Sequence, residues 1–296
     1  MDQHLVVFVT VADYKNFSRA AEALHMSQPA VSQYIAALER EFEVKLLERN
    51  NKSVQVNKAG QIVYQYAKEI LRNYERMQIL VSDLKNDPSG ELKIGASYTI
   101  GEYFLPGLLG VLRKRYLKIV PDVTIGNTTE IAQKLLNHQI DIGLVEGDFN
   151  HRSILTQHFA TDDMYIIAGE GQSLIKQSIV LPKELEKQTW IIREEGSGTR
   201  KMVEDFFQKH SIQPLRVLTF GSTQIIKEAV EAGLGISLLS DLTIKKELKL
   251  NTISKLLVKD TPVQRKFSII KNNQEFHTKA MQVFEQVVNT AIARND

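Results

Sequence analysis

Residues 17–49 have the sequence FSRAAEALHMSQPAVSQYIAALEREFEVKLLER, and this stretch decides the fold of the N-terminal part of the chain. Its second half predicts a two-faced helix, at about 100° per residue. One narrow stripe is apolar and consists of Val31, Ile35, Leu38 and Phe42. The opposite face is small, polar or basic and contains no acid: Pro29, Ser32, Gln33, Ala36 and Arg40. Such a face suits a DNA major groove. The alternative is an ordinary amphipathic surface helix.

A shorter helix is expected just before it, with Ser18 as its cap and the small residues Ala20 and Ala21 at the crossing point. Ser27 is placed to cap the second helix, because Pro29 in the first turn costs no hydrogen bond. A third helix is predicted upstream from the apolar face formed by Leu5, Phe8, Val9 and Ala12. Three short helices on one core predict a helix-turn-helix domain.

The segment that follows the two-faced helix, residues 49–58, has basic side chains and no acid. Val54 and Val56 alternate with polar residues, as in a short β-hairpin. The segment therefore predicts a wing along the DNA backbone, with Arg49 and Lys52 on phosphates. The alternative is a solvated loop. Contacts to the DNA are predicted for Ser27, Gln28, Pro29, Ser32, Gln33, Arg40, Arg49 and Lys52.

Residues 1–60 resemble the winged DNA-binding domain of the LysR-type bacterial transcriptional regulators. The matching positions are Ala20-Ala21, Leu24, residues 27–32, Leu38-Glu39 and residues 46–49. Three positions depart from the family pattern. Glu43 stands where a glycine usually ends the recognition helix, so the helix is expected to run on or to end less cleanly. Leu47 replaces a common Phe, and Asn57 replaces a Thr but caps a helix equally well.

Composition bounds the class of protein. The chain has 296 residues, of which 43% are apolar and 24% charged, enough for two or three domains. It has no run of about 20 apolar residues and no signal-peptide pattern, so we expect a cytoplasmic protein with no membrane contact. The absence of cysteine excludes disulfides and thiolate sites. The first 90 residues hold 11 basic and 11 acidic side chains, so DNA binding rests on local placement.

A long helix is predicted over residues 58–85, on the order of 40 Å in length. Its narrow apolar seam consists of Val63, Tyr66, Ile70, Tyr74, Met77, Leu80, Val81 and Leu84. Such a seam needs a partner helix. The family resemblance implies the same helix of a second subunit, and hence a homodimer or homotetramer on a near-palindromic double-stranded promoter site. The alternative is packing on the chain's own effector domain. The sequence NDPSG at residues 86–90 is typical of a hinge.

Beyond residue 90, short apolar runs alternate with amphipathic helices, which predicts an α/β fold with parallel sheets. Strands are expected at residues 92–96, 123–125, 140–145, 164–168, 190–193, 217–220 and 236–239. Helices are expected at residues 104–116, 131–136, 203–209, 225–232 and 275–293. The pattern resembles the periplasmic-binding-protein-like effector domain of the same family. The predicted domains are 1–60 (winged helix-turn-helix), 61–86 (linker helix), 87–90 (hinge) and 91–296 (effector binding), the last with subdomain one at 91–161 and 268–296 and subdomain two at 162–267.

Ligands in open parallel sheets bind beyond the carboxyl ends of the strands, so the cleft between the subdomains is the predicted sensing site. Four strand-to-helix turns bearing hydroxyls are expected there, at residues 96–101, 126–129, 193–200 and 221–223. They predict a small anionic effector, held by N–H groups, hydroxyls and arginine. The predicted contacts are Ser97, Tyr98, Thr99, Asn127, Thr128, Glu146, Arg193, Ser197, Thr199, Arg200 and Ser222. Each turn by itself fits an ordinary helix cap, and Glu146 fits a surface acid equally well.

The same turns resemble one branch of the family, which contains regulators of carbon-dioxide fixation and of sulfite reduction. The resemblance rests on residues 95–106, 126–128, 144–147 and 193–200. It implies a sulfite-like oxyanion, or a phosphorylated or organic acid metabolite, as effector. No cofactor is implied, and RNA polymerase is a further expected partner.

An enzyme would need a base beside a nucleophile, or a set of metal ligands. The seven histidines are scattered, with no pair at helical spacing. Residues 196–198 (GSG) do not form a nucleophile elbow, and no Walker or dinucleotide motif is present. We therefore expect no enzymatic activity; the alternative of a small-molecule-binding enzyme has no positive support. A solute-binding protein would fit residues 91–296 alone, but not the first 90 residues or the missing export signal.

Overall fold

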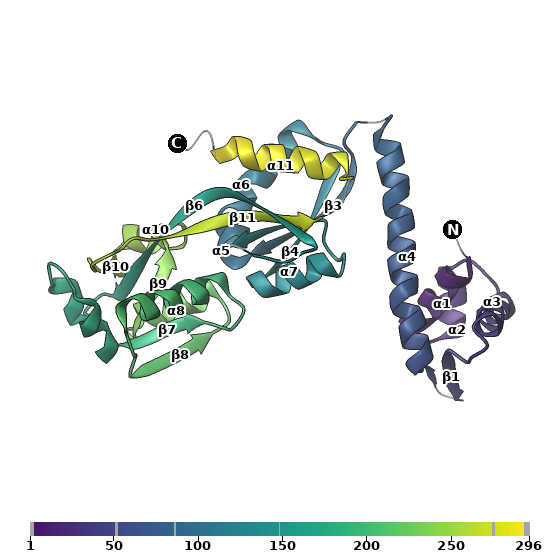
Figure 1. The fold of residues 1–296 in the computed structure, drawn as a ribbon, viewed down its shortest axis with the longest axis horizontal. Coiled ribbons are helices and arrows are strands. Elements are labelled where there is room, and N and C mark those ends of the chain that lie inside the picture. Colours follow the sequence, from purple (N-terminus) through teal and green to yellow (C-terminus); the bar gives the residue numbers. More distant parts are fainter. Residues whose placement is uncertain (1–2, 51–52, 86, 148, 274–275, 293–296) are drawn as a thin grey trace. The chain divides into compact units, whose positions relative to one another are not determined.

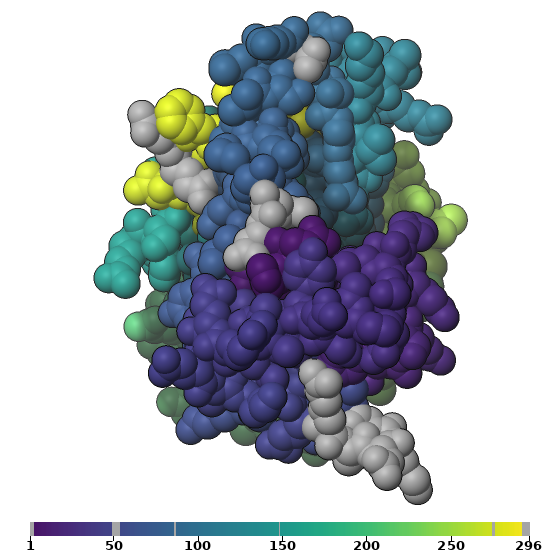
Figure 2. All heavy atoms as spheres, turned by 90° about the vertical axis from the view of Figure 1, so that its right-hand side faces the viewer, coloured from purple at the N-terminus to yellow at the C-terminus, as the bar shows by residue number. Residues whose placement is uncertain are grey.

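The computed structural model describes residues 3–50, 53–85, 87–147, 149–273 and 276–292. The chain divides into two compact units, Met1–Lys85 and Asn86–Asp296. The elements of the first unit are α1 (Gln3–Tyr14), α2 (Phe17–Ala23), α3 (Gln28–Glu41), β1 (Leu47–Asn50), β2 (Ser53–Val56) and α4 (Lys58–Asp83). In the space-filling view the purple atoms of the early residues of this unit form one continuous patch on the face shown (Figure 2).

The three short helices share one apolar core, as the sequence predicts. Phe8 of α1, Ala20 of α2 and both Val31 and Ile35 of α3 are fully buried in the same cluster. Ala20 allows close approach because it adds no bulk at the crossing. Phe42 departs from the predicted stripe: it caps the end of α3 and is 47% exposed, so its assignment to the core was wrong.

Helix ends follow local capping chemistry, with one correction. Ser27 accepts a hydrogen bond from the Ala30 N–H at 3.3 Å, and Asn57 accepts one from the Gly60 N–H at 2.8 Å, as predicted. The cap of α2 is Asn16, which accepts from the Arg19 N–H; the assignment of Ser18 was wrong. Ser18 lies inside the first turn, where its side chain cannot reach the N–H groups that need an acceptor.

The recognition helix ends cleanly despite the missing glycine. Helix α3 stops at Glu41, and Glu43 takes the left-handed conformation with φ of 54°. Its N–H donates to the Arg40 carbonyl at 3.2 Å, which closes the helix end. The helix therefore does not run on. Instead, Glu43 adopts the left-handed conformation that the turn after α3 requires, although this conformation is unfavourable for any residue with a Cβ.

A buried carboxylate attaches the wing to the recognition helix. Glu39 is 5% exposed and accepts the N–H groups of Leu46 at 3.0 Å and Leu47 at 3.3 Å, with Lys45 Nζ at 2.8 Å. Burial alone raises the pKa of the Glu39 carboxyl, but Lys45 and the two N–H groups outweigh it and hold the pKa below its usual value. The first strand of the β1–β2 hairpin is thus positioned directly by α3.

Helix α4 carries much of the predicted seam at its surface. Val63 and Leu71 pack against the core of the first unit. Farther along and on the other face, Tyr66, Ile70, Met77, Val81 and Leu84 are each at least 50% exposed. The rest of the first unit therefore leaves most of the seam uncovered.

The second unit contains one sheet of nine strands, in the order β4-β3-β5-β11-β6-β9-β7-β8, with β10 also paired to β6 (Figure 1). Its strands are β3 (Gly90–Ser97), β4 (Ile119–Gly126), β5 (Ile142–Glu146), β6 (Ile154–Gly169), β7 (Thr189–Arg193), β8 (Arg216–Phe220), β9 (Ile236–Ser240), β10 (Ile253–Lys255) and β11 (Val263–Asn272). Its helices are α5 (Tyr98–Tyr103), α6 (Leu105–Arg115), α7 (Thr128–Leu136), α8 (Gly198–His210), α9 (Thr223–Glu231), α10 (Asp241–Leu250) and α11 (Lys279–Ile292), with 3-10 turns at Ser173–Lys176 and Pro182–Lys187.

Two long strands, β6 and β11, carry the chain between the halves of this sheet. They pair antiparallel over their length, from Val263 opposite Met164 to Asn272 opposite Ile154. At one end β11 borders β5, and at the other β6 borders β9. The two separate apolar clusters on either side, one around Leu92 and one around Trp190, show that each half has its own core.

The expected βα order is confirmed, but the expectation of purely parallel pairing is incomplete. Strand β3 pairs parallel with β4 and β5, and β7 pairs parallel with β8 and β9. The central pairs that involve β6, β10 and β11 are antiparallel. The sequence did not indicate β10, β11 or α10. It also missed that the predicted helix 104–116 follows a separate short helix, α5.

The strained conformation at Glu43 predicts a stabilising substitution. Glu43→Gly should raise the free energy of unfolding of the first unit by about 0.5–1 kcal/mol, because glycine adopts positive φ without a Cβ clash. Thermal and urea unfolding of the full chain, followed by a signal from this unit, measure the change.

Glu41→Gly is the matched control. Glu41 is the last residue of α3, in helical conformation. The same glycine there should destabilise by about 1 kcal/mol. Equal effects of both variants would show that the left-handed conformation at Glu43 carries no cost.

Candidate functional site

The predicted DNA-contacting side chains of α3 share one surface. Ser27, Gln28, Pro29, Gln33 and Arg40 are exposed, and Ser32 is half-buried. Gln28 Nε2 donates to Ser32 Oγ at 3.0 Å, and Arg40 Nε donates to the Ala36 carbonyl at 3.3 Å. These contacts orient the side chains without burying them. Arg49 lies in β1, but its side chain, and all of Lys52, lie outside the described residues.

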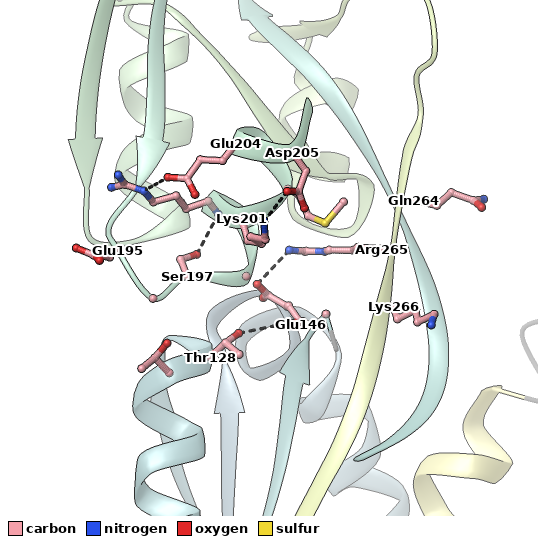
Figure 3. A pocket seen from close by; sticks show the side chains of 16 residues that line it. Thr128, Glu146, Glu195, Ser197, Lys201, Glu204, Asp205, Gln264, Arg265 and Lys266 are labelled. Atoms are coloured by element: carbon pink, nitrogen blue, oxygen red, sulfur yellow. Dashed lines mark hydrogen bonds and ion pairs between the residues drawn. The ribbon is translucent and has the colours of Figure 1, made fainter. Parts of the chain in front are cut away.

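Two of the four turns that were predicted to meet, at residues 126–129 and 193–200, line one pocket between the halves of the second unit. A pocket of about 780 Å³ lies there, lined among others by Thr128, Glu146, Ser197 and Arg200 from the predicted set (Figure 3). Backbone contact joins the two sides, because the Thr129 N–H donates to the Gly196 carbonyl at 3.2 Å. The pocket is thus closed at one side by turns from both halves.

Glu146, for which the sequence left open a role as a surface acid, is 3% exposed. Its carboxylate accepts from the Thr99 N–H at 3.0 Å and from Thr199 Oγ1 at 3.3 Å. Thr99 belongs to α5 in one half, and Thr199 to α8 in the other. The Glu146 carbonyl also accepts from Thr128 Oγ1 at 3.4 Å. Glu146 therefore connects three of the predicted turns.

The centre of this network is a residue that sequence reasoning missed. Arg265, on β11, is 3% exposed, and its guanidinium donates to four oxygen atoms. Nε donates to Asp162 Oδ2 at 2.7 Å, and Nη1 to Glu146 Oε2 at 3.0 Å. Nη1 also donates to Thr199 Oγ1 at 2.9 Å, and Nη2 to Thr99 Oγ1 at 3.1 Å.

The cross-strand position of Arg265 explains its reach. Arg265 stands opposite Asp162 where β11 and β6 cross between the halves, and Asp162 accepts from Ser240 Oγ at 2.6 Å. In Figure 3, Arg265 points toward Glu146, whereas Gln264 and Lys266 point away on the other face of the strand. A basic residue at an inward position of an alternating strand is the one sequence signal that indicates it.

The two carboxyls beside Arg265 titrate differently. Burial raises the pKa of Glu146, but Arg265, the hydrogen bonds of Thr99 and the charge of Arg193 outweigh burial and hold that pKa below its usual value. At Asp162 burial prevails over Arg265 and Ser240, and the nearby Glu146 adds to it, so the pKa of Asp162 is raised. The pKa values of the two carboxyl partners of Arg265 are thus shifted in opposite directions.

The two arginines expected to bind an anion are already paired. Arg193 donates from Nε and Nη2 to the two carboxylate oxygens of Glu194, at 2.6 and 2.7 Å. Its guanidinium carbon lies 4.4 Å from the centre of the Tyr98 ring. Arg200 Nε donates to Glu204 at 2.7 Å, and its Nη1 to the Arg193 carbonyl at 3.4 Å. An anion that uses either arginine must therefore exchange with a carboxylate.

The remaining predicted residues differ in their surroundings. Ser97 is fully buried, and its Oγ has no hydrogen-bond partner among the described residues. Ser197 caps α8, and Asn127 caps α7 and donates from Nδ2 to Glu194 Oε1 at 3.4 Å. Ser222 does not line the pocket, and its side chain does not cap α9. The neighbouring Thr223 is instead the residue that accepts from Arg193.

Other chemistries are not represented in the described part of the chain. It contains no group of three or more His, Asp or Glu side chains arranged to hold a metal ion. None of its helices is both long and apolar enough to cross a membrane.

Comparison with family models decides the class. Residues 3–61 match the helix-turn-helix model of the bacterial lysR family, and residues 85–293 match the LysR substrate binding domain. The chain belongs to the LysR family of transcriptional regulators. The winged helix-turn-helix and the periplasmic-binding-protein-like domain, both expected from the resemblance, are thereby confirmed.

Individual relatives support the branch indicated by the sequence. The chain is 38% identical over 280 residues to the HTH-type transcriptional regulator CysL of Bacillus subtilis (95% of this chain, 94% of that protein). It is 31% identical over 288 residues to a probable RuBisCO transcriptional regulator of Phaeodactylum tricornutum (95% and 94%). Among solved structures, the Synechocystis CcmR regulatory domain in complex with 2-PG is 27% identical, with a TM-score of 0.64 (69% of this chain, 97% of that one).

Removal of the central guanidinium should destabilise the second unit. Arg265→Met leaves Glu146 and Asp162 buried together without a cation. The expected loss is about 3–5 kcal/mol of unfolding free energy near neutral pH, measured by urea denaturation. Lys266→Met, on the exposed side of the same strand, is the matched control and should change stability by no more than about 0.5 kcal/mol.

The penalty of Arg265→Met should shrink as the pH falls. In the variant the two carboxyls lose the charge that lowers their pKa values, so the folded state takes up protons before the unfolded state does. Stability of the variant then rises as pH decreases from about 7 to about 5. Over the same range the wild type keeps the stabilisation from the lowered pKa of Glu146, which is lost only when pH falls through that folded pKa. A penalty independent of pH would contradict this account.

Proposed function

We propose that the chain is a regulator whose DNA binding responds to a small oxyanion-bearing effector in the pocket between the halves of residues 91–296. The proposed effector is a sulfite-like oxyanion, or a phosphorylated or organic acid metabolite. The proposed regulated genes belong to sulfur or carbon assimilation. The proposal is supported by one observation above all. Turns from both halves line this pocket, and Ser97, which lies opposite Gly126 at the start of one of these turns, has a buried Oγ with no partner among the described residues. An unpaired buried hydroxyl is costly unless a ligand satisfies it.

The surrounding groups fit this class of ligand. Ser97 lies beside Gly126 in the β3–β4 register, immediately before the cap residue Asn127. Thr128, Ser197 and Arg200 line the adjacent pocket. Hydroxyls, amide groups and exchangeable guanidinium groups suit an oxyanion. The relative whose solved structure contains 2-PG supports a small-molecule effector for the same domain.

The DNA half of the proposal assigns base contacts to the exposed face of α3 and phosphate contacts to Arg49 and Lys52. The uncovered seam of α4 supports pairing with the same helix of a second chain, which brings two recognition helices to one near-palindromic promoter site. A homotetramer, contact with RNA polymerase, a cytoplasmic location and the subdomain limits at 161/162 and 267/268 belong to the same proposal. The relatives are named as transcriptional regulators, which favours this function over an enzyme or a transport protein.

Effector binding is proposed to act through the strands that join the two halves. A ligand held between the halves changes their relative angle only as far as it binds one arrangement more tightly. Arg265 is bonded to both halves, so its hydrogen bonds must adjust to that angle. In an assembled dimer, the change alters the spacing of the two recognition helices.

Gln33→Ala tests the DNA-contacting face. Loss of a base contact should weaken binding by roughly 1–3 kcal/mol and relax specificity at one base position. Gel-shift titration against the promoter and single-base variants measures both. Gln65→Ala, an exposed Gln of α4, is the control. Unchanged affinity and footprint in a Ser32→Ala, Gln33→Ala double variant would refute the assignment.

Ser97→Ala tests the effector site. Because the hydroxyl has no partner, the ligand-free melting temperature should stay close to that of the wild type. Affinity for the effector should fall roughly 3–10-fold through the lost hydrogen bond. A thermal-shift screen of sulfur oxyanions and phosphorylated acids, including 2-PG, supplies the ligand, since binding to the native state raises stability.

Thr252→Ala is the control for this experiment, because Thr252 Oγ1 is also buried without a partner among the described residues but lies between α10 and β10, whereas Ser97 stands opposite Gly126, where the 126–129 turn begins. It should leave effector affinity unchanged. Equal loss in both variants, or full effector response in Ser97→Ala, would count against the proposed site.

A further inference from the structure

The anion position of Arg193 is occupied by the chain's own carboxylate. Arg193 is 1% exposed and ends β7, and Glu194 is the next residue. Successive residues of a strand point to opposite faces, so their side chains do not normally meet. Here the chain turns out of the strand after Arg193. Both oxygens of Glu194 return to the guanidinium, at 2.6 and 2.7 Å. Two parallel bonds of this kind are the geometry in which arginine binds a carboxylate or phosphate ligand.

The same carboxylate is held by the other half of the unit. Asn127 Nδ2 donates to Glu194 Oε1 at 3.4 Å, while Asn127 Oδ1 accepts from the Glu130 N–H at 3.0 Å. The cap bond fixes the orientation of the amide, so its N–H₂ group must face Glu194. Tyr98, also from the first half, covers the guanidinium face at 4.4 Å. The position is therefore built from both halves, independently of which anion fills it.

Arg193 and Glu194 are not equally fixed. The arginine is enclosed by Tyr98, Thr223 and the sheet, whereas the Glu194 side chain is 28% exposed. Glu194 can leave by rotation into solvent, where its charge is hydrated. Arg193 is enclosed and stays in place when Glu194 leaves. Its buried charge then has no carboxylate partner, which is a costly state. If the pair opens, the guanidinium stays behind as a vacant anion site, beside the Tyr98 ring and Thr223 Oγ1.

We propose that Glu194 is a tethered competitor of the effector: its carboxylate occupies the anion position formed by Arg193 and Asn127, and the oxyanion of the effector displaces it. This inference rests on the proposed function and names how its site is regulated. One anion replaces another on the same guanidinium, so the charge balance of the closed site is preserved. The effector must exceed a threshold set by the tethered carboxylate, because only the open fraction of the protein binds. Ligands that offer two oxygens to the fork are favoured over those that offer one.

Glu194→Gln removes the competing charge and nearly keeps the shape of the side chain. Titration calorimetry of the full chain with sulfite, sulfate and inorganic phosphate is the measurement. The variant should bind at least one of these probes about tenfold more tightly than the wild type. Glu194→Ala should behave in the same way, which separates loss of competition from any new contact made by the amide.

Glu195→Gln is the matched control. It removes the same charge one residue along, from an exposed side chain that also lines the pocket but makes no hydrogen bond to Arg193 within the described part of the chain, and that points away from Glu146 and Arg265 in Figure 3. Its probe affinities should stay within about twofold of the wild type, because a solvent-exposed charge is screened. If Glu194→Gln and Glu195→Gln increased probe affinity equally, the increase would be a general effect of charge. That result would overturn the proposal.

The outcomes separate this inference from the function on which it rests. Probe affinity that is no higher in both Glu194 variants than in the wild type, with all proteins folded by circular dichroism, overturns the competitor alone. Absence of probe binding in those variants overturns it too, since a vacated Arg193 must accept an anion. The proposed function is tested separately, by whether any metabolite of the thermal-shift screen changes DNA binding of the wild type and fails to do so in Ser97→Ala.

Discussion

The effector-binding unit depends on one buried guanidinium. Arg265 stands where β6 and β11 pass between the two halves, and it donates to Asp162 and Glu146 as well as to hydroxyls from both sides. A buried charge of this kind is stable only when carboxylates and hydrogen bonds compensate it. Because its partners come from both halves, the angle between the halves and the geometry of the pocket cannot change separately. The junction of the two halves and one wall of the pocket thus share one hydrogen-bond network.

Pairing of the cations changes how anion recognition works here. A site with free arginines attracts any anion, including chloride and phosphate at cellular concentration. In this structure Arg193 is paired with Glu194, and Arg200 with Glu204, so a ligand gains only the difference between its own bonds and those it displaces. In the proposed mechanism, specificity arises from exchange, because the incoming group must match the guanidinium fork that Glu194 leaves. A neutral, occupied site of this kind discriminates better than an open positive one, at some cost in affinity.

In the first unit, the positions of individual charged side chains matter more than their total number. The first 90 residues carry equal numbers of basic and acidic side chains, so the overall field contributes little attraction. The proposed DNA contacts therefore rely on the oriented face of α3, on the wing that Glu39 attaches to it, and on two such units acting together. In both units, therefore, buried carboxylates position the groups that make contacts. Glu39 does this for the wing, and Glu146 for the turns of the pocket.

The sequence by itself determined the features that depend on neighbours along the chain: the two-faced helix, the caps at Ser27 and Asn57, the long α4 and the βα order of the second unit. These follow from periodicity and from side chains that bond within a turn. It did not determine which of two nearby residues, Asn16 or Ser18, caps α2, nor that β11 exists. Only the tertiary structure brought Arg265 to Glu146 and Thr99, which lie 119 and 166 residues away. Whether a charge is buried, and which partner compensates it, is set by which strands meet, and no local pattern contains that information.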